Sequence, residues 1–87
     1  MLKEISKLVK SIYTEAEIEA FFKELLTESE IETLSKRWRI LEMLNQGFTQ
    51  REIAKELQVS LCKVTRGAKI MKEEKSILAK YLKTENQ

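Results

Sequence analysis

The sequence contains no proline and no histidine, only two glycines, and a single cysteine, Cys62. One cysteine without any histidine excludes both an intramolecular disulfide and a zinc cluster. A lone thiol is typical of a reducing compartment, so we predict a cytoplasmic protein. The absence of proline, together with abundant leucine, isoleucine, glutamate and lysine, predicts an all-α fold.

Long apolar runs are also absent. No stretch approaches the roughly 18 apolar residues that a membrane span requires. Residues 1–7 include Glu4 and lack a cleavable apolar core, so we expect neither a membrane segment nor a secretory signal. A chain of 87 residues is one domain with a small core of its own. With disulfides and metals excluded, oligomerisation is the remaining source of stability.

Catalytic constellations are missing as well. The sequence has no histidine, no phosphate-binding glycine loop, no set of metal ligands and no nucleophile placed beside a base. We therefore expect a protein that is not an enzyme and that has no metal site.

Charge is distributed unevenly along the chain, although its formal net value is only +2. Residues 1–35 hold four Lys against eight Glu, a net of −4, whereas residues 50–72 hold six Lys and Arg against two Glu, a net of +4. A basic segment joined to an acidic half indicates that one face meets an anion. An ordinary solvated surface would give the same asymmetry, so charge alone leaves both interpretations open.

Helix starts are marked by capping boxes, in which a threonine is followed three residues later by glutamate. These boxes are Thr14 to Glu17, Thr27 to Glu30 and Thr49 to Glu52, and Ser60 is a further N-cap. Between the caps, apolar residues recur with the 3.6-residue period of a helix. We predict about six helices: residues 2–12, 15–25, 28–46 (followed by Gly47), 50–57, one from residue 61 onward, and 75–83.

We expect one helical domain over residues 1–87. Within it, residues 1–47 supply dimerisation helices, residues 50–67 form a helix-turn-helix, and residues 75–83 form a C-terminal helix. Trp38 lies on the apolar stripe of the third helix, so we expect it in the core.

The segment 50–67 has the residue types that a helix-turn-helix needs. Ala54 allows the two short helices to cross closely, and Gln58 stands in the turn where a positive φ is expected. Apolar residues would close the corner, namely Ile53, Leu57, Val59, Leu61 and Val64. A plain helical hairpin without a DNA partner is the alternative.

The helix-turn-helix geometry assigns DNA contacts to particular residues. Gln50 and Arg51, at the start of the first helix, would hold phosphates. The second helix would enter the major groove and face the base edges. Its reading residues would be Ser60, Leu61, Cys62, Lys63, Thr65 and Arg66. We expect double-stranded DNA with a palindromic operator as the partner; a helical module that binds another protein is the alternative.

Several fragments resemble the Trp repressor family. They are Leu26 to Glu30, Leu34, Arg37 to Glu42, Thr49 to Ile53 and, above all, Val64-Thr65-Arg66-Gly67, and together they span about residues 24–70. Residues 21–27 look closer to the smaller Trp-repressor-related proteins, whose effector is not established. The resemblance implies an intertwined homodimer with two DNA-reading heads, acting as a repressor.

The resemblance also implies L-tryptophan, or a related small ligand, as co-repressor. In this family resemblance, Thr27 and the Leu26 carbonyl would lie near the ammonium group of the ligand. Arg37 would stack on the indole ring, and Arg66 would pair with the carboxylate. Gly67 would let the ligand approach the backbone. An ion pair with Glu30 or Glu42 is the alternative for Arg37. The family has Thr where this chain has Lys63, and Ser where it has Ile70. These departures favour the alternative hypothesis, a dimer that acts without tryptophan.

Overall fold

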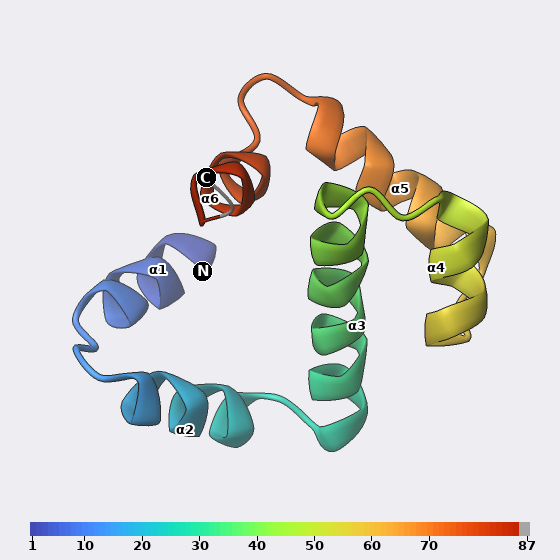
Figure 1. Ribbon diagram of the computed structural model, residues 1–87. Helices are drawn as coiled ribbons and strands as arrows, with labels where there is room; N and C mark the ends of the chain where they lie inside the picture. Colours follow the sequence, from blue (N-terminus) through green and yellow to red (C-terminus); the bar gives the residue numbers. More distant parts are fainter. Residues whose placement is uncertain (86–87) are drawn as a thin grey trace. The chain divides into compact units, whose positions relative to one another are not determined.

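The computed structural model describes residues 1–85, and this part of the chain is all-helical, as predicted, with no strand. Its six helices are α1 (Leu2–Lys10), α2 (Glu15–Leu25), α3 (Glu28–Asn45), α4 (Gln50–Leu57), α5 (Leu61–Lys72) and α6 (Ile77–Glu85) (Figure 1). None of these helices is long and apolar enough to cross a membrane. The chain divides into two compact units, Met1–Thr33 and Leu34–Gln87, with the boundary inside α3.

The predicted caps explain where four of the helices begin. At Thr14, Thr27 and Thr49 the threonine hydroxyl accepts a hydrogen bond from the amide three residues later, at 3.1–3.2 Å. At Thr27 the box is reciprocal, because the Glu30 carboxylate accepts from the Thr27 amide at 2.9 Å. Each cap satisfies a backbone donor that would otherwise lack a partner, which stabilises the helix by about 1 kcal/mol.

Two helices have bounds that differ from the prediction by two residues, and α3 ends one residue earlier than predicted. α1 ends at Lys10 rather than at residue 12, because the Ser11 hydroxyl and amide both donate to the Leu8 carbonyl and close the last turn. α6 covers Ile77–Glu85 rather than residues 75–83. Its start is set by Ser76, whose hydroxyl accepts from the Ala79 amide at 3.1 Å, a cap that was not predicted from the sequence.

The core of the second unit is a cluster contributed by three helices. Ile40 and Met43 come from α3, Ile53 from α4 and Val64 from α5, and all four are at most 3% exposed. Partly buried apolar side chains pack against this cluster, namely Leu44, Ala54, Leu57 and Val59. The cluster therefore holds both helices of the predicted helix-turn-helix against α3.

The end of α3 also anchors α6. Leu82 and Ala79 of α6 are buried, and the Asn45 side chain donates to the Leu82 carbonyl at 3.2 Å. Leu41 and Asn45 lie one helical turn apart on the same side of α3. Leu34 and Trp38 continue this row towards the N-terminus of the helix. These two are 44% and 38% exposed, so the prediction that Trp38 lies in the core is wrong for the single chain.

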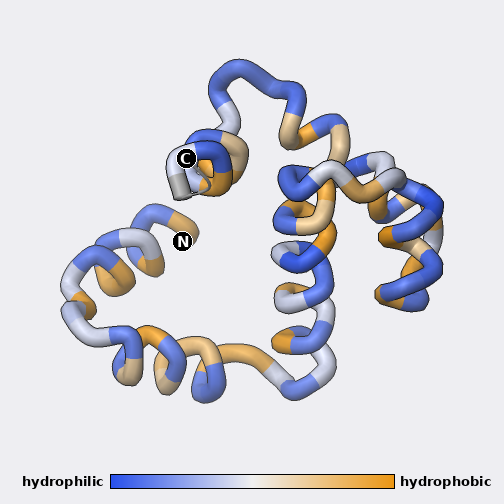
Figure 2. The backbone as a smooth tube through the Cα atoms, viewed as in Figure 1, coloured by the Kyte–Doolittle hydropathy of each residue, from blue (hydrophilic) through white to orange (hydrophobic). Residues whose placement is uncertain are grey.

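The first unit has no buried residue in either α1 or α2. The apolar row of α1 is exposed at Leu2, Ile5 and Leu8, with exposed fractions of 76%, 39% and 52%. Figure 2 shows hydrophobic and hydrophilic residues alternating along both helices. In α2 the rings of Phe21 and Phe22 meet edge to face, with centroids 5.4 Å apart. An apolar helix face left in water is energetically unfavourable.

Candidate nucleic-acid interface

α4 and α5 form the predicted helix-turn-helix, with Gln58, Val59 and Ser60 between them. Gln58 adopts the left-handed conformation (φ 54, ψ 48) that was expected of the turn. The Val59 amide donates to the Ala54 carbonyl at 3.1 Å and closes the end of α4. Ser60 then starts α5, because its hydroxyl accepts from the Lys63 amide at 3.4 Å.

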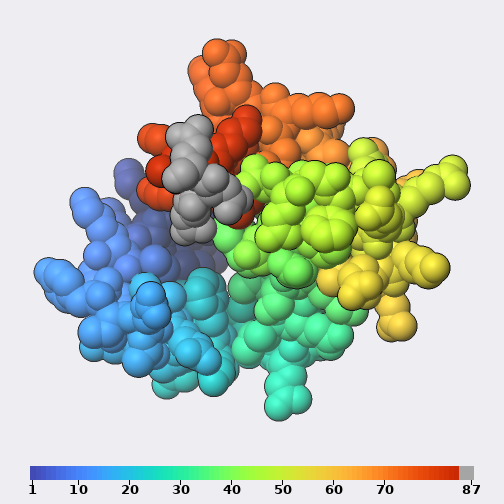
Figure 3. Space-filling view, in the orientation of Figure 1, coloured from blue at the N-terminus to red at the C-terminus, as the bar shows by residue number. Residues whose placement is uncertain are grey.

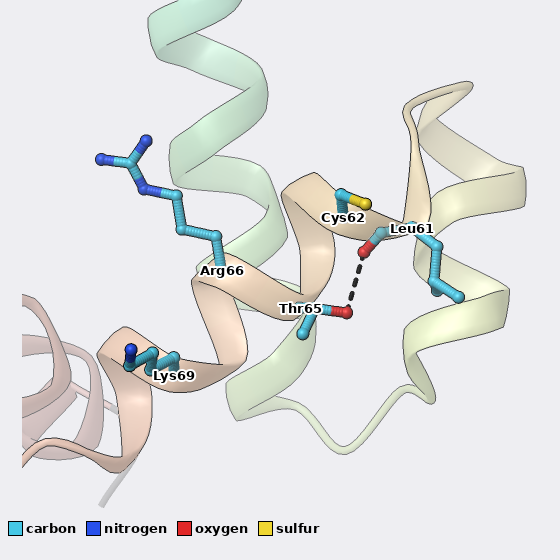
Figure 4. A pocket seen from close by; sticks show the side chains of 5 residues that line it. All are labelled: Leu61, Cys62, Thr65, Arg66 and Lys69. Atoms are coloured by element: carbon cyan, nitrogen blue, oxygen red, sulfur yellow. Dashed lines mark hydrogen bonds between the residues drawn. The ribbon is translucent and has the colours of Figure 1, made fainter.

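The two sides of α5 differ sharply in burial. Val64 is fully buried, and Gly67 is buried against α3. The opposite side lines a shallow, open depression and consists of Leu61, Cys62, Thr65, Arg66 and Lys69 (Figure 4). Leu61 is 46% exposed, so the prediction that it closes the apolar corner is wrong. Cys62 is exposed as well, and contact of these two side chains with base edges stays a prediction.

The exposed cations of α5 lie on and beside this face. Arg66 and Lys69 line the depression, and Lys63 is exposed about 60° round the helix from Arg66. Within residues 1–85 none of the three forms an ion pair with an acidic side chain. Their positive charge is therefore available to an external anion.

A hydrogen bond between side chains connects the two helices. The Thr65 hydroxyl lies 2.9 Å from Gln50 Oε1 and 3.0 Å from the Leu61 carbonyl oxygen, and it can donate to either. Gln50 is the half-buried first residue of α4, and this bond connects its side-chain oxygen to α5. Both residues were predicted as DNA contacts, but the bond between them was not. The two residues are 15 positions apart on different helices, so the helix period of the sequence does not indicate that their side chains meet.

The first turn of α4 presents Arg51 to solvent, next to the half-buried Gln50. Long side chains of α4, yellow-green and yellow in Figure 3, project outward from the surface. The structure thus brings Gln50 together with Thr65 of the reading helix, and it exposes Arg51 and all six reading residues between Ser60 and Arg66.

Comparison with known proteins decides the family. The family model described as Trp repressor protein matches residues 1–86. The chain belongs to the Trp repressor family. No curated protein and no solved structure matches it. Membership of the Trp repressor family identifies a DNA-binding transcriptional regulator, and the family is regulatory rather than enzymatic.

The residues that a Trp repressor would use for its effector fall in both units. Leu26 and Thr27 belong to the first unit, where they connect α2 and α3. The Thr27 hydroxyl already accepts from the Glu30 amide as a helix cap, and Leu26 is half-buried. Arg37, Arg66 and Gly67 belong to the second unit.

Gly67 has a structural reason to be glycine. A Cβ built on it would lie 2.8 Å from Ile40 Cγ2 and 3.4 Å from the nearest methyl carbons of Leu41 and Leu44. The missing side chain therefore lets α5 cross α3 closely, and the space on that side is filled by α3 side chains. Approach of an effector to Gly67 stays a prediction.

Arg37 is exposed on α3, and the two ion pairs considered for it do not form within residues 1–85. The carboxylate of Glu42 instead lies 3.7 Å from Arg39 Nη1, and that of Glu30 caps the Thr27 amide. Arg37 and Arg66 are therefore both without a carboxylate partner in the second unit. Within residues 1–85, no group of three or more His, Cys, Asp or Glu side chains is placed to hold a metal ion.

Proposed function

We propose that this member of the Trp repressor family is a repressor that binds a palindromic site in double-stranded DNA as a homodimer. The main support is the two-sided burial of α5. Val64 and Gly67 attach the helix to α3 and α4, while Lys63, Arg66 and Lys69 are exposed and have no acidic partner among residues 1–85. A helix held by one side and cationic on the other can enter the major groove of DNA.

In this proposal the two helices have different roles. The N-terminal part of α5 faces base edges through Ser60, Leu61, Cys62 and Thr65, while the first turn of α4 holds a phosphate through Gln50 and Arg51. Half-sites would lie 10–10.5 bp apart, the established spacing for helix-turn-helix dimers, of which the Trp repressor is itself a standard example. The exposed thiol of Cys62 fits a reducing cytoplasm, where we place the protein.

A second copy of the chain is the proposed partner of the exposed apolar side chains. In the first unit these are the α1 residues Leu2, Ile5 and Leu8. In the second unit they are Leu34 and Trp38 of α3 and, on α6, Ile77, Leu78 and Tyr81. Their burial in a homodimer would contribute roughly 25 cal/mol for each Å² removed from water. The proposed domain organisation follows, with residues 1–47 chiefly dimerising and residues 50–67 chiefly binding DNA.

Binding of a mixed-sequence duplex, followed by fluorescence anisotropy at several salt concentrations, tests the DNA-binding role. Lys63→Ala and Arg66→Ala should each weaken binding about tenfold or more, because each removes a cation from both heads of the dimer. The slope of log K against log salt should become shallower by about 0.9 for every phosphate that the variant no longer neutralises.

The matched control is Lys10→Ala, which removes an exposed cation from α1 and should leave DNA affinity unchanged. Equal affinity of wild type, Lys63→Ala and Arg66→Ala would reject the placement of α5 in the groove. The absence of DNA binding even at low salt would instead favour the protein-interaction module.

Control by L-tryptophan is the part of the proposal that concerns regulation. It is supported by the exposed guanidinium groups of Arg37 and Arg66, which form no ion pair within the described residues 1–85 and could stack on an aromatic ring and bind a carboxylate. Calorimetric titration of L-tryptophan into the purified protein decides whether the regulator is controlled by tryptophan or acts without a ligand. Saturable heat that is lost in Arg66→Ala supports a tryptophan-controlled repressor, and a flat titration supports a ligand-independent regulator.

A further inference from the structure

The chemistry of the reading helix restricts which bases it can recognise. α5, Leu61–Lys72, contains no Asn, Gln, Asp or Glu. In the major groove, Asn and Gln are the usual partners of adenine, and Asp and Glu accept from the amino group of cytosine. Neither kind of contact can come from α5. Guanine acceptors, reached by Arg or Lys, and the thymine C5-methyl group, reached by apolar side chains, remain.

The outward face of α5 is largely apolar between its cations. Leu61 is 46% exposed and Cys62 is exposed, and both line the depression with Thr65. Leu61 is not part of the buried core cluster, which α5 enters through Val64, and about half of Leu61 stays open to solvent.

The one hydroxyl in the depression is already engaged. The Thr65 oxygen lies 2.9 Å from Gln50 Oε1 and 3.0 Å from the Leu61 carbonyl, so its hydrogen is directed to the protein (Figure 4 draws the second bond). Its donor is therefore not available to the O4 acceptor of thymine or to the acceptors of guanine. Thr65 keeps its acceptor lone pairs and its methyl group, whereas Leu61 can offer a base edge only nonpolar contact and Cys62 little more than that.

Arg66 and Lys69 border this apolar surface and have no acidic partner within residues 1–85. An occupant must therefore combine an apolar group with nearby negative charge or hydrogen-bond acceptors. The major groove of DNA offers this combination where a thymine methyl lies beside guanine O6 and N7 or beside phosphates. Charge complementarity thus favours DNA over an uncharged apolar partner.

We infer that Leu61 and Cys62 recognise thymine through its C5-methyl group, so that each half-site contains an A·T pair whose thymine methyl enters the depression between them. The inference rests on the proposed function, because it concerns the same DNA-reading helix. It names Leu61 and Cys62 as specificity-determining residues, and it assigns Arg66 and Lys69 to the adjoining guanine acceptors or phosphates.

The test begins with selection of bound duplexes from a random-sequence pool by the full-length protein. Each thymine of the selected site is then replaced in turn by deoxyuridine, which removes only the methyl group and keeps the base pairing. Wild-type affinity should fall about fourfold for each contacted methyl. In Leu61→Ala and Cys62→Ser the ratio of affinities for thymine and deoxyuridine should move towards one. Both side chains are exposed, so circular dichroism should show an unchanged fold.

Lys69→Ala is the matched control, since it should weaken binding to both duplexes while keeping their ratio. Thymine recognition would be overturned if the selected site had no thymine in either half, if wild-type protein bound every deoxyuridine duplex as tightly as the thymine duplex, or if the affinity ratio were unchanged in both variants. Any of these results would leave the repressor proposal intact. A wild-type protein that enriches no sequence and binds no DNA would overturn the proposed function itself.

Discussion

At the scale of single residues, the two glycines of the chain serve different purposes. Gly47 ends α3 with φ +96, and a Cβ there would meet nothing within 4 Å. Its amide donates to the Leu44 carbonyl and the following amide donates to the Met43 carbonyl, so its role is to adopt the left-handed conformation. Gly67 has no such φ, and its role is to leave space for Ile40. One position is glycine for conformation and the other for packing.

Gly67→Ala should therefore destabilise the fold by about 1–3 kcal/mol, because the new methyl overlaps a side chain that is only 2% exposed. Gly47→Ala should cost about 1 kcal/mol through backbone strain alone. Denaturant unfolding monitored by circular dichroism measures both values.

A double-mutant cycle separates the two causes. Ile40→Ala removes the atom that the new methyl would meet, so Gly67→Ala should cost less in that background, whereas the cost of Gly47→Ala should not change. An alanine at residue 67 that leaves wild-type stability unaltered would contradict the packing explanation.

At the scale of elements, the docking of α6 depends on a contact between residues that are far apart in the sequence. The side chain of Asn45 donates to the Leu82 carbonyl at 3.2 Å across a separation of 37 residues. Leu82 and Ala79 are buried, while Ile77 and Tyr81 of the same helix are 67% and 61% exposed. α6 is thus attached by one side, and one polar bond fixes its position against α3.

Asn45→Ala should loosen α6 without unfolding α4 and α5. A hydrogen bond of this kind contributes about 0.5–1.5 kcal/mol, so amide exchange within α6 should accelerate by roughly twofold to twelvefold. Hydrogen exchange followed by mass spectrometry would measure this, with Gln46→Ala, at an exposed neighbouring position, as the control. Equal acceleration in all helices would show that Asn45 supports the whole unit rather than α6.

At the scale of the whole molecule, the exposed apolar side chains favour association of two chains. α1 and α2 contain no buried residue, although α1 has a continuous apolar row. In the second unit, Leu34 and Trp38 form the continuation of the α3 row against which α6 docks. Such surfaces would be covered in a homodimer, and stability would then depend on protein concentration.

We expect wild-type protein to sediment as a dimer and its melting temperature to rise with concentration. Leu8→Glu should shift the population towards monomer, because it places a charge on the apolar row of α1, where Leu8 is 52% exposed. Lys7→Glu, on the polar side of the same helix, is the matched control and should remain dimeric. A wild-type monomer with a concentration-independent melting temperature would refute the dimer.

Much of the local structure was predictable. The starts of α2, α3, α4 and α5 follow from Thr14, Thr27, Thr49 and Ser60, and the left-handed Gln58 was expected from the turn. The candidate site was predictable in outline, since the reading residues from Ser60 to Arg66 are exposed as expected. These features depend on residues three or four positions apart, which the helix period places together whatever the remainder of the chain does.

Other features could not be derived in this way. The exposure of Trp38 and Leu61, the bond from Thr65 to Gln50, the bond from Asn45 to Leu82 and the contact of Gly67 with Ile40 all depend on which sides of two helices meet. An apolar stripe shows that a helix has a side to bury but not what covers it. Local sequence thus suffices to specify the helices, their caps and the cationic reading segment. Which apolar side of α3 faces the core depends on packing in three dimensions, because helix packing is a contact between distant segments and has no local periodicity.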